Sequence, residues 1–368
     1  MGKRHREVES LVIDRAFWKG RRVFLTGHTG FKGAWMVLLL RSLGAQVTGF
    51  ALPPDSKQGL FEIAGVADDV DHRIGDIRNL AALQLAITEA RPSLVIHMAA
   101  QSLVRTSYEE PIETYATNVM GTVHVLDVLR RVSGIEALVV VTSDKCYENP
   151  GLGDGFRELD AMGGHDPYSS SKGCAELVTA AYRHSFFRAP GAVRVASARA
   201  GNVIGGGDWA RDRLIPDMMR SFMADEIVRI RYPSAIRPWQ HVLDPLLGYL
   251  TLAQQLVEGT NDFAEGWNFG PGSESEVPVS TLVEQMSRRW GPRARWQLDQ
   301  NEHPHEAAYL KLDCSKAHTR LGWRPLIGLD LALQMTCDWY LAMADGKDMR
   351  QLSMRQIANV MEQALRHA

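Results

Sequence analysis

The stretch from Arg22 to Gly33, RVFLTGHTGFKG, decides the predicted fold of this 368-residue chain. A short apolar run leads into Gly27, Gly30 and Gly33, and an apolar segment with helical spacing then continues as far as Gly44. In this order a strand, a glycine-rich loop and a helix direct backbone amides at the helix N-terminus toward a bound pyrophosphate. The stretch therefore predicts a dinucleotide-binding unit.

The alternation of strand and helix continues to about residue 201. The pattern predicts strands over residues 22–25, 46–51, 70–74, 93–97, 137–142 and 192–198, and helices over residues 80–90, 115–132 and 168–187. Strands that alternate with helices form a parallel sheet covered on both faces. Right-handed crossovers then favour a doubly wound, Rossmann-like α/β fold with a smaller C-terminal lobe.

We expect the chain to divide into four parts. Residues 1–20 form a polar lead-in, and residues 21–201 form the dinucleotide-binding domain, which also reclaims about residues 240–258. Residues 202–345 mainly form a substrate-binding lobe with helices over residues 216–223 and 277–290, and residues 346–368 form a C-terminal helical tail.

The composition is that of an ordinary globular protein, with 45% hydrophobic and 23% charged residues and a net charge of −2. No overall field therefore favours nucleic acid or an anionic membrane as a partner. The most apolar stretch, residues 34–40, is too short to cross a bilayer, and the first nine residues lack the apolar core of a signal peptide. We expect a cytoplasmic protein.

The cysteines and histidines do not indicate a metal site. The four cysteines stand apart in the sequence and none belongs to a C-x-x-C pair. His303 and His305 flank a proline but have no further ligand residues nearby. We expect no metal.

Tyr168 and Lys172 stand four residues apart, on one face of a predicted helix. A lysine cation near a phenol favours the tyrosinate, which can remove a hydroxyl proton while a hydride leaves the same carbon. The alternative is two unrelated surface residues. The glycine loop and the strand that ends at Thr142-Ser143 favour the catalytic pair.

Five motifs together resemble the extended short-chain dehydrogenase/reductase family: TGHTGFKG (26–33), HMAAQS (97–102), NVMGT (118–122), TSDK (142–145) and YSSSK (168–172). Three stretches, TGHTGFKG, AGNVIGGGDW (200–209) and RPWQHVLD (237–244), are similar to the members that dehydrate CDP-glucose. The resemblance covers roughly residues 17–345. It implies NAD as cofactor and CDP-glucose as substrate. The implied reaction oxidises C4, eliminates water across C5 and C6, and returns the hydride to C6.

The resemblance also implies three catalytic roles next to Tyr168 and Lys172. Ser143 would hydrogen bond the substrate near C4, or serve only as a structural cap. Asp144 would protonate the departing C6 hydroxyl. Lys145 would take the C5 proton or position the group that does, and as a base it must be neutral. Its alternative role is a pair with Asp144 or with a phosphate.

Most of the predicted cofactor-binding residues lie at the ends of the first, third, fourth and fifth predicted strands or on the helix of Tyr168 and Lys172, and Asn118 lies on the predicted helix over residues 115–132. They are Gly27, His28, Thr29, Gly30, Phe31, Lys32, Gly33, Asp76, Ile77, Ala99, Ala100, Asn118, Thr142, Tyr168 and Lys172. Asp76 could accept a hydrogen bond from the adenine amino group or cap a helix. His28 and Lys32 could be solvated or lie against the phosphates or nicotinamide.

The second predicted strand ends in GFAL (49–52), without an acid for the ribose hydroxyls and without an arginine for a 2′-phosphate. NAD is therefore favoured over NADP. We expect weak adenosine binding, so that the purified chain holds less than one NAD per chain.

Candidate substrate-binding residues lie mainly downstream. They are Gln101, Ser102, Asn202, Arg211, Arg213, Arg237 and His241. Arginine suits a bidentate grip on a diphosphate, although each arginine could also form a surface ion pair. Trp209 and Trp239 could stack near the cytosine or fill the lobe interface.

Two other interpretations remain open. The chain could be another sugar-nucleotide enzyme of the family, either an epimerase or a C5-inverting 4,6-dehydratase. It could also be a non-catalytic, regulatory nucleotide-binding protein, although the presence of Ser143, Asp144, Tyr168 and Lys172 argues against this. By analogy with relatives we expect a homodimer.

Overall fold

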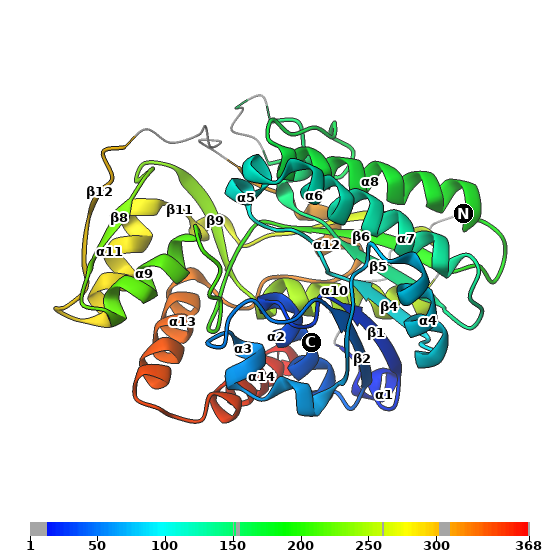
Figure 1. The fold of residues 1–368 in the computed structure, drawn as a ribbon, viewed down its shortest axis with the longest axis horizontal. Helices are drawn as coiled ribbons and strands as arrows, with labels where there is room; N and C mark the ends of the chain where they lie inside the picture. Colours follow the sequence, from blue (N-terminus) through cyan, green and yellow to red (C-terminus); the bar gives the residue numbers. More distant parts are fainter. Residues whose placement is uncertain (1–12, 150, 152–154, 260, 302–309, 367–368) are drawn as a thin grey trace, which may run out of the picture.

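A seven-stranded parallel sheet forms the centre of the computed structural model, which describes residues 13–149, 151, 155–259, 261–301 and 310–366 (Figure 1). The strand order is β10-β6-β5-β4-β1-β2-β3, and every neighbouring pair is parallel. The strands are β1 (Arg22–Thr26), β2 (Gln46–Ala51), β3 (Asp71–Ile74), β4 (Leu94–His97), β5 (Ala137–Val141), β6 (Arg194–Ala200) and β10 (Gly266–Phe269). The predicted doubly wound α/β fold is confirmed.

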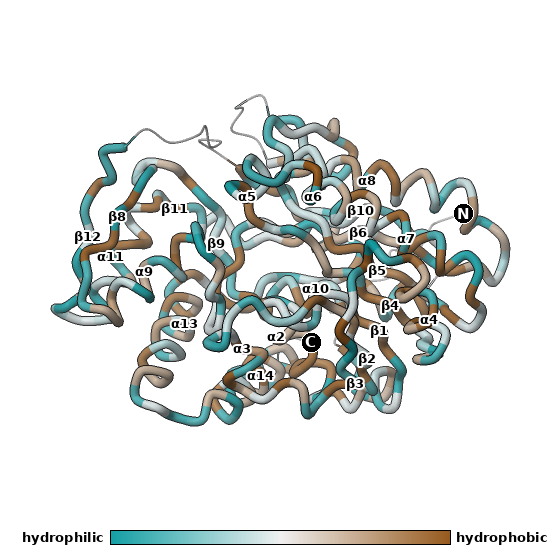
Figure 2. Tube along the Cα trace, viewed as in Figure 1, coloured by the Kyte–Doolittle hydropathy of each residue, from teal (hydrophilic) through white to brown (hydrophobic). Residues whose placement is uncertain are grey.

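Both faces of this sheet are buried, because neighbouring residues of a strand point to opposite faces. Val23 and Leu25 of β1 pack into the core that contains α2 (Phe31–Ser42) and α10 (Leu243–Glu258). Phe24 faces the other core, with α4 (Leu80–Ala90) and α7 (Gly121–Leu129). Figure 2 shows the hydrophobic segments along the central strands β1, β4 and β5.

The long helix α8 (Pro167–Phe186) packs beside α7 and begins at a well-formed cap. The carboxylate of Asp166 accepts a hydrogen bond from the Ser169 amide, and Pro167 occupies the first helical position. The predicted helix over residues 115–132 instead starts as α6 (Pro111–Tyr115) and passes through a π-helical segment, Ala116–Met120, before α7.

The smaller lobe lies on the left in Figure 1 and contains short strands and two amphipathic helices. One small sheet joins β7 (Asn202–Ile204), β9 (Ile236–His241) and β11 (Glu276–Pro278), and another joins β8 (Ile227–Ile230) and β12 (Arg295–Leu298). The helices are α9 (Leu214–Met223) and α11 (Val279–Trp290). The remaining short helices of the chain are α1 (Arg15–Trp18), α3 (Leu60–Ile63), α5 (Val104–Glu109) and α12 (Ser315–Arg320).

Residues 243–258 return to the large sheet as helix α10, which packs against β5 and β6. Asp244 in its first turn is buried and accepts hydrogen bonds from the amides of Leu326 (2.8 Å) and Ile327 (3.3 Å). Burial raises the pKa of Asp244 to about 7. The seventh strand, β10, was not predicted, because a four-residue segment with a central asparagine carries little strand signal.

Two long helices, α13 (Leu329–Ala344) and α14 (Met349–Arg366), complete the chain. In Figure 1 they run from the smaller lobe back to α2 and α3, and α14 packs against both of these helices. Among the described residues no helix is long and apolar enough to cross a membrane.

Candidate active site

The glycine loop after β1 has the close backbone contacts that a dinucleotide cradle needs. Gly27 has a φ of +78°, and a Cβ there would lie 2.7 Å from the amide nitrogen of Ala99. A Cβ on Gly33 would lie 2.1 Å from the carbonyl oxygen of Gly27. Gly30 is the N-cap of α2 and leaves the helix N-terminus without a side-chain cap. The amides at this helix N-terminus are of the kind that binds a pyrophosphate, and the assignment of the individual loop residues stays a prediction.

The loop after β4 is tied to the glycine loop. The Thr26 hydroxyl accepts hydrogen bonds from the amides of Met98 and Ala99, each at 3.1 Å. It also lies 2.7 Å from Nδ1 of His97, whose pKa burial and the Lys172 charge lower to about 3. A neutral His97 therefore joins the ends of β1 and β4, with Ala99 and Ala100 half-buried at the edge of the cradle.

His28 is fully buried, so the alternative that it is solvated is wrong. Its ring occupies the space above Gly49, where a Cβ would lie 2.3 Å from the His28 ring, and its Nε2 lies 2.6 Å from Nδ1 of His72. Burial and His72 lower the pKa of His28 to about 4. The neighbouring Thr29 hydroxyl donates to the carbonyl of Leu52 (2.9 Å). Both loop residues are thereby packed onto the end of β2.

Asp76 is engaged by Arg78. Its carboxylate accepts from the Arg78 amide (2.8 Å) and from the Arg78 guanidinium (2.6 Å to Oδ2). These hydrogen bonds lower the pKa of Asp76. The buried Ile77 packs on Gly121, where a Cβ would lie 2.4 Å from the Ile77 methyl group. An adenine amino group would therefore share the Asp76 carboxylate with Arg78.

Asn118 lies in the π-helical segment and is buried. Its side-chain amide donates to the carbonyl of Gln101 (2.9 Å) and the hydroxyl of Ser171 (2.8 Å), and its Oδ1 accepts from the Gln101 amide (2.9 Å). The Gln101 side chain donates to Thr114 (2.9 Å) and Leu103. Asn118 thus joins the loop after β4 to α8, and the Gln101 side chain joins the same loop to α6.

Ser143, Asp144 and Lys145 begin a 3-10 turn directly after β5. The Ser143 hydroxyl donates to Asp144 Oδ1 (3.0 Å) and accepts from the Lys145 amide (3.2 Å). Asp144 is almost fully buried, and burial raises the pKa of its carboxyl although Lys145, Ser143, Lys32 and Arg237 oppose this. A carboxyl of this kind suits an acid that must hold a proton.

Tyr168, in the first turn of α8, lies beside Ser143. Burial raises the pKa of Tyr168 to about 12; the Ser143 hydroxyl and the Arg213 charge lower it, and Asp144 raises it. Lys172 is one turn further along α8, and its amine donates to the carbonyl of Val141 (3.4 Å). Burial lowers the pKa of Lys172 to about 8.

Beneath the Tyr168–Lys172 pair lies a buried ionic network that the sequence analysis missed. Glu176 of α8 accepts from Arg199 (2.7 Å) and Ser197 (2.6 Å) of β6 and from the hydroxyl of Thr142 after β5. Arg199 also donates to the phenol of Tyr147 (2.6 Å). Burial acts to raise the pKa of Glu176, but Arg199 and the hydroxyl donors lower it overall. The network fixes α8 against β5 and β6.

Lys32 brings a further cation to the active site. Burial lowers its pKa to about 8; the charges of Arg213 and Lys172 also lower it, whereas Asp144 and Asp208 raise it. The residue that the sequence left open between solvent and cofactor therefore lies within the field of the catalytic groups. Its amine contributes positive charge opposite Asp144.

Arg213 and Ser102 meet across the active-site edge. The Arg213 guanidinium donates to the Ser102 hydroxyl (2.8 Å) and pairs with Asp208 Oδ2 (3.0 Å). The structure thus brings together two of the predicted substrate-binding residues. Asp208, which the sequence analysis did not single out, holds the pair.

The other predicted substrate-binding residues take different positions. Asn202 is half-buried in β7, Arg211 is exposed, and Arg237 is buried in β9 and acts on Asp144 through its charge. His241 is fully buried beside Trp35 of α2, its Nδ1 accepts from the Leu243 amide (3.3 Å), and burial lowers its pKa to about 3. A role of His241 in substrate binding stays a prediction.

The two tryptophans of the downstream motifs lie in the lobe. Trp209 packs edge-on against Tyr340 of α13, with the ring centroids 5.7 Å apart, and Trp239 is buried in β9. Both rings therefore fill the interface, which is the second of the two alternatives that the sequence left open.

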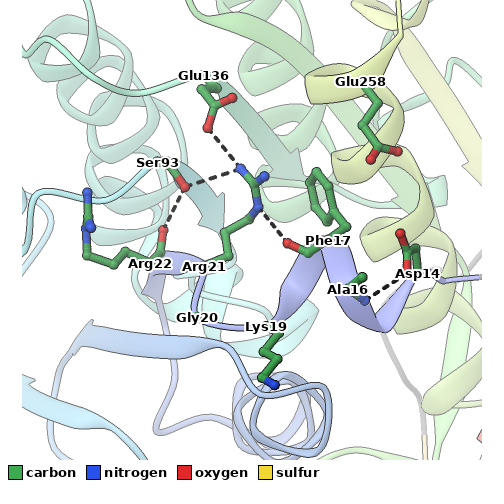
Figure 3. A pocket seen from close by; sticks show the side chains of 10 residues that line it. All are labelled: Asp14, Ala16, Phe17, Lys19, Gly20, Arg21, Arg22, Ser93, Glu136 and Glu258. Carbon is green, nitrogen blue, oxygen red and sulfur yellow. Dashed lines mark hydrogen bonds and ion pairs between the residues drawn. The ribbon is translucent and has the colours of Figure 1, made fainter.

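A surface depression lies at the amino ends of the strands, at the opposite end of β1 from the glycine loop (Figure 3). It is lined by residues that precede strands, including Arg21 before β1, Ser93 before β4 and Glu136 before β5. Arg21 donates to Glu136 (2.9 Å) and to the carbonyl of Phe17 (3.1 Å). Ligands of open α/β sheets bind at the carboxyl ends of the strands, so this depression is not the active site.

Among the described residues, no group of three or more histidine, cysteine or acidic side chains could hold a metal ion. His303 and His305 lie outside the described residues.

The fold and the Tyr168–Lys172 geometry define the class of protein. Residues 24–336 match the family model described as GDP-mannose 4,6 dehydratase. The chain therefore belongs to this family of extended short-chain dehydrogenases/reductases.

Within the family, CDP-glucose 4,6-dehydratase of Salmonella typhimurium is 53% identical over 359 residues, which cover 96% of this chain and 100% of that protein. dTDP-glucose 4,6-dehydratase of Haemophilus influenzae is 25% identical and covers 87% of this chain and 97% of its own length. The structure of DesIV (dTDP-glucose 4,6-dehydratase) from Streptomyces venezuelae with NAD and TYD bound has a TM-score of 0.76 at 21% identity, covering 89% of this chain and 99% of that one. This structural likeness shows a shared fold.

The Glu176–Arg199 pair yields a stability prediction. Glu176→Gln leaves Arg199 buried without a counter-charge, so the free energy of unfolding at neutral pH should fall by about 3 kcal/mol, measured by urea denaturation. Because folding lowers the Glu176 pKa from 4.5, the contribution of the pair is present above that pH and is lost as the pH falls through the folded-state value.

The matched control is Glu284→Gln, which removes an exposed pair with Arg288 on α11 (3.7 Å) and should change the free energy of unfolding by no more than about 0.5 kcal/mol. Equal losses in the two variants would contradict a structural role of the buried pair.

Proposed function

We propose that the chain is an NAD-dependent sugar-nucleotide 4,6-dehydratase that converts CDP-glucose to CDP-4-keto-6-deoxyglucose. The observation that carries the proposal is the convergence of Ser143, Asp144 and Tyr168 beside the glycine cradle. The relative at 53% identity supports the cytidine nucleotide as the substrate's carrier.

The cradle fits NAD, because its glycines keep the backbone amides at the N-terminus of α2 accessible. When bound there, NAD supplies the chemistry of accepting a hydride from C4 and returning one to C6. The chain's own residues then have to orient the sugar, move protons and exclude water.

Tyr168 takes the proton of the C4 hydroxyl in this proposal. Ser143 and Arg213 lower the Tyr168 pKa, whereas burial and an ionised Asp144 raise it. A protonated Asp144 carries no opposing charge, so the acid that the elimination needs also favours the tyrosinate that the oxidation needs.

Asp144 and Lys145 carry out the elimination. Once C4 is a ketone, the C5 proton is acidic and is transferred to a neutral Lys145 or to the group that Lys145 positions. The C6–O bond breaks as Asp144 gives its proton to the departing hydroxyl, so that water leaves. Burial raises the pKa of Asp144, which favours the protonated form that this step needs.

Ser102, Asn202, Arg211, Arg213 and Arg237 are proposed to bind the nucleotide sugar. The support is strongest for Arg213. Its guanidinium donates a hydrogen bond to the Ser102 hydroxyl, and its charge lowers the pKa of Tyr168. Arg211 is exposed, and we propose that it binds the diphosphate. Gln101 would act through its position in the loop after β4, and His241 would act through packing.

The family also contains epimerases, such as UDP-glucuronate 4-epimerase 3 of Arabidopsis thaliana at 25% identity over 356 residues. A 4-epimerase needs the proton transfer by Tyr168 at the C4 hydroxyl but no acid for a departing C6 hydroxyl. A buried carboxyl with a raised pKa next to Ser143 has a use in elimination, which favours the dehydratase.

The substrate test is incubation of the chain with NAD⁺ and CDP-, dTDP-, GDP- or UDP-glucose. We expect a 4-keto-6-deoxy product, detected by its absorbance in alkali, with CDP-glucose turned over at least about tenfold faster than the others. Recovery of a C4 epimer without ketone, or no turnover of any nucleotide sugar, would contradict the proposal.

The variant Lys145→Ala distinguishes the C4 oxidation from the elimination of water. If Lys145 is the C5 base, 4-keto-6-deoxy product should fall by about 10²- to 10⁴-fold, while C4 oxidation, followed as NADH absorbance in a single turnover, largely survives. Tyr168→Phe is the control and should abolish both signals. Loss of the NADH signal in Lys145→Ala as well would reassign Lys145 to binding or positioning.

We also propose that the chain is a cytoplasmic homodimer. All four cysteines are free thiols, which suits a reducing compartment. Apolar side chains lie exposed on the adjacent helices α6 to α8, with Ile112 at 82%, Leu177 at 59% and Met120 at 47% exposure. This face of the molecule is the proposed contact with a second copy.

Light scattering should therefore give twice the chain mass of 41.0 kDa, and Leu177→Glu should reduce it to the mass of one chain. Leu331→Glu, at an exposed leucine of α13, is the control and should leave the dimer intact. A wild-type mass of 41.0 kDa would contradict the proposal.

A further inference from the structure

Three consecutive carbonyl groups in the loop after β7 are each held by a different helix. The indole of Trp35 in α2 donates to the carbonyl of Gly206 (3.0 Å). The amide of Leu60, at the start of α3, donates to Gly207 (3.1 Å). The phenol of Tyr340 in α13 donates to Asp208 (2.7 Å). The loop backbone is thus fixed by the cofactor-binding half and by the C-terminal helices together.

The loop also fits closely against these partners. A Cβ on Gly206 would lie 2.0 Å from the ring of Trp339, and one on Gly207, which has a φ of +80°, would lie 2.5 Å from the Leu60 side chain. Tyr340 is fully buried. A displacement of α13 therefore moves the loop backbone.

The side chain of Asp208 links the loop to the candidate active site. Its carboxylate pairs with the Arg213 guanidinium (3.0 Å), whose other nitrogen reaches the Ser102 hydroxyl (2.8 Å). The positive charge of Arg213 in turn lowers the pKa of both Tyr168 and Lys32. The Tyr340 phenol is therefore two residues removed from the catalytic groups, through Asp208 and Arg213.

Helix α14 holds α13 in place. The Trp339 indole donates to the Ser353 hydroxyl (3.0 Å), and Arg350 donates to Asp69 (2.8 Å), which also pairs with Arg41 of α2 (3.4 Å). In Figure 1 the two helices run from the lobe to the underside of α2. The match to the family model ends at residue 336, so Tyr340 and α14 lie beyond it.

We propose that Tyr340 is a positioning residue, which holds the Asp208 backbone so that Arg213 extends over the active site to Ser102. Helices α13 and α14 thereby affect substrate binding through the position of Arg213. This inference rests on the proposed function only in that Arg213 is taken to contact the substrate.

The variant Tyr340→Phe removes the hydroxyl and keeps the ring against Trp209. We expect the KM for CDP-glucose to rise about five- to tenfold with kcat changed less than about twofold. Amide hydrogen exchange over residues 205–213 should become faster. Tyr182→Phe, which removes a phenol on α8 where the ring packs against Phe186, is the control and should change neither quantity.

A double-mutant cycle with Arg213→Gln shows whether Tyr340 acts through Arg213. The double variant should then have the KM of Arg213→Gln alone, whereas additive increases would overturn the proposal. Unchanged KM and unchanged exchange in Tyr340→Phe would also overturn it. Should Tyr340→Phe not fold, Ser353→Ala loosens α13 instead and should speed exchange over residues 205–213; unchanged exchange there would count against the proposal.

The exchange measurement needs no substrate. A wild-type chain that turns over no CDP-glucose would therefore defeat the proposed function, while faster exchange in Tyr340→Phe would still support the positioning of the loop.

Discussion

The ion pair between Glu176 and Arg199 is the interaction on which the active site depends. It lies in the interior, where an unpaired charge is strongly unfavourable, so α8 can approach β6 only in the register that brings the two residues together. Thr142 joins the same carboxylate from the end of β5. Tyr168 and Lys172 on α8 are thereby fixed next to the residues that follow β5, before any substrate binds.

Around this fixed centre cationic side chains outnumber carboxylates. Lys32, Lys172 and Arg213 contribute positive charge, whereas Asp144 is buried and its pKa is raised. An excess of cations at the carboxyl edge of the sheet suits a substrate with a diphosphate. Burial raises the pKa of Asp144 more than the charges of Lys145, Lys32 and Arg237 lower it.

Parts of the chain that are far apart in sequence meet in the loop of residues 205–209. Trp35 comes from the first long helix and Tyr340 from the last long helix but one, and they donate to the carbonyls of Gly206 and Asp208, on either side of Gly207. The substrate-binding side of the site is therefore supported by the cofactor-binding half and by the C-terminal helices. The same loop carries Asp208, which restrains Arg213.

The sequence by itself determined the parallel sheet, the glycine loop and the Tyr168–Lys172 pair, because each depends on residue types at short, regular spacing. It did not reveal the Glu176–Arg199 pair, the burial of His28 on Gly49, or the support of Asp208 by Tyr340. Those contacts join residues that are 21 to 132 positions apart in the sequence. Only tertiary packing decides which distant side chains meet, and burial then sets their charge.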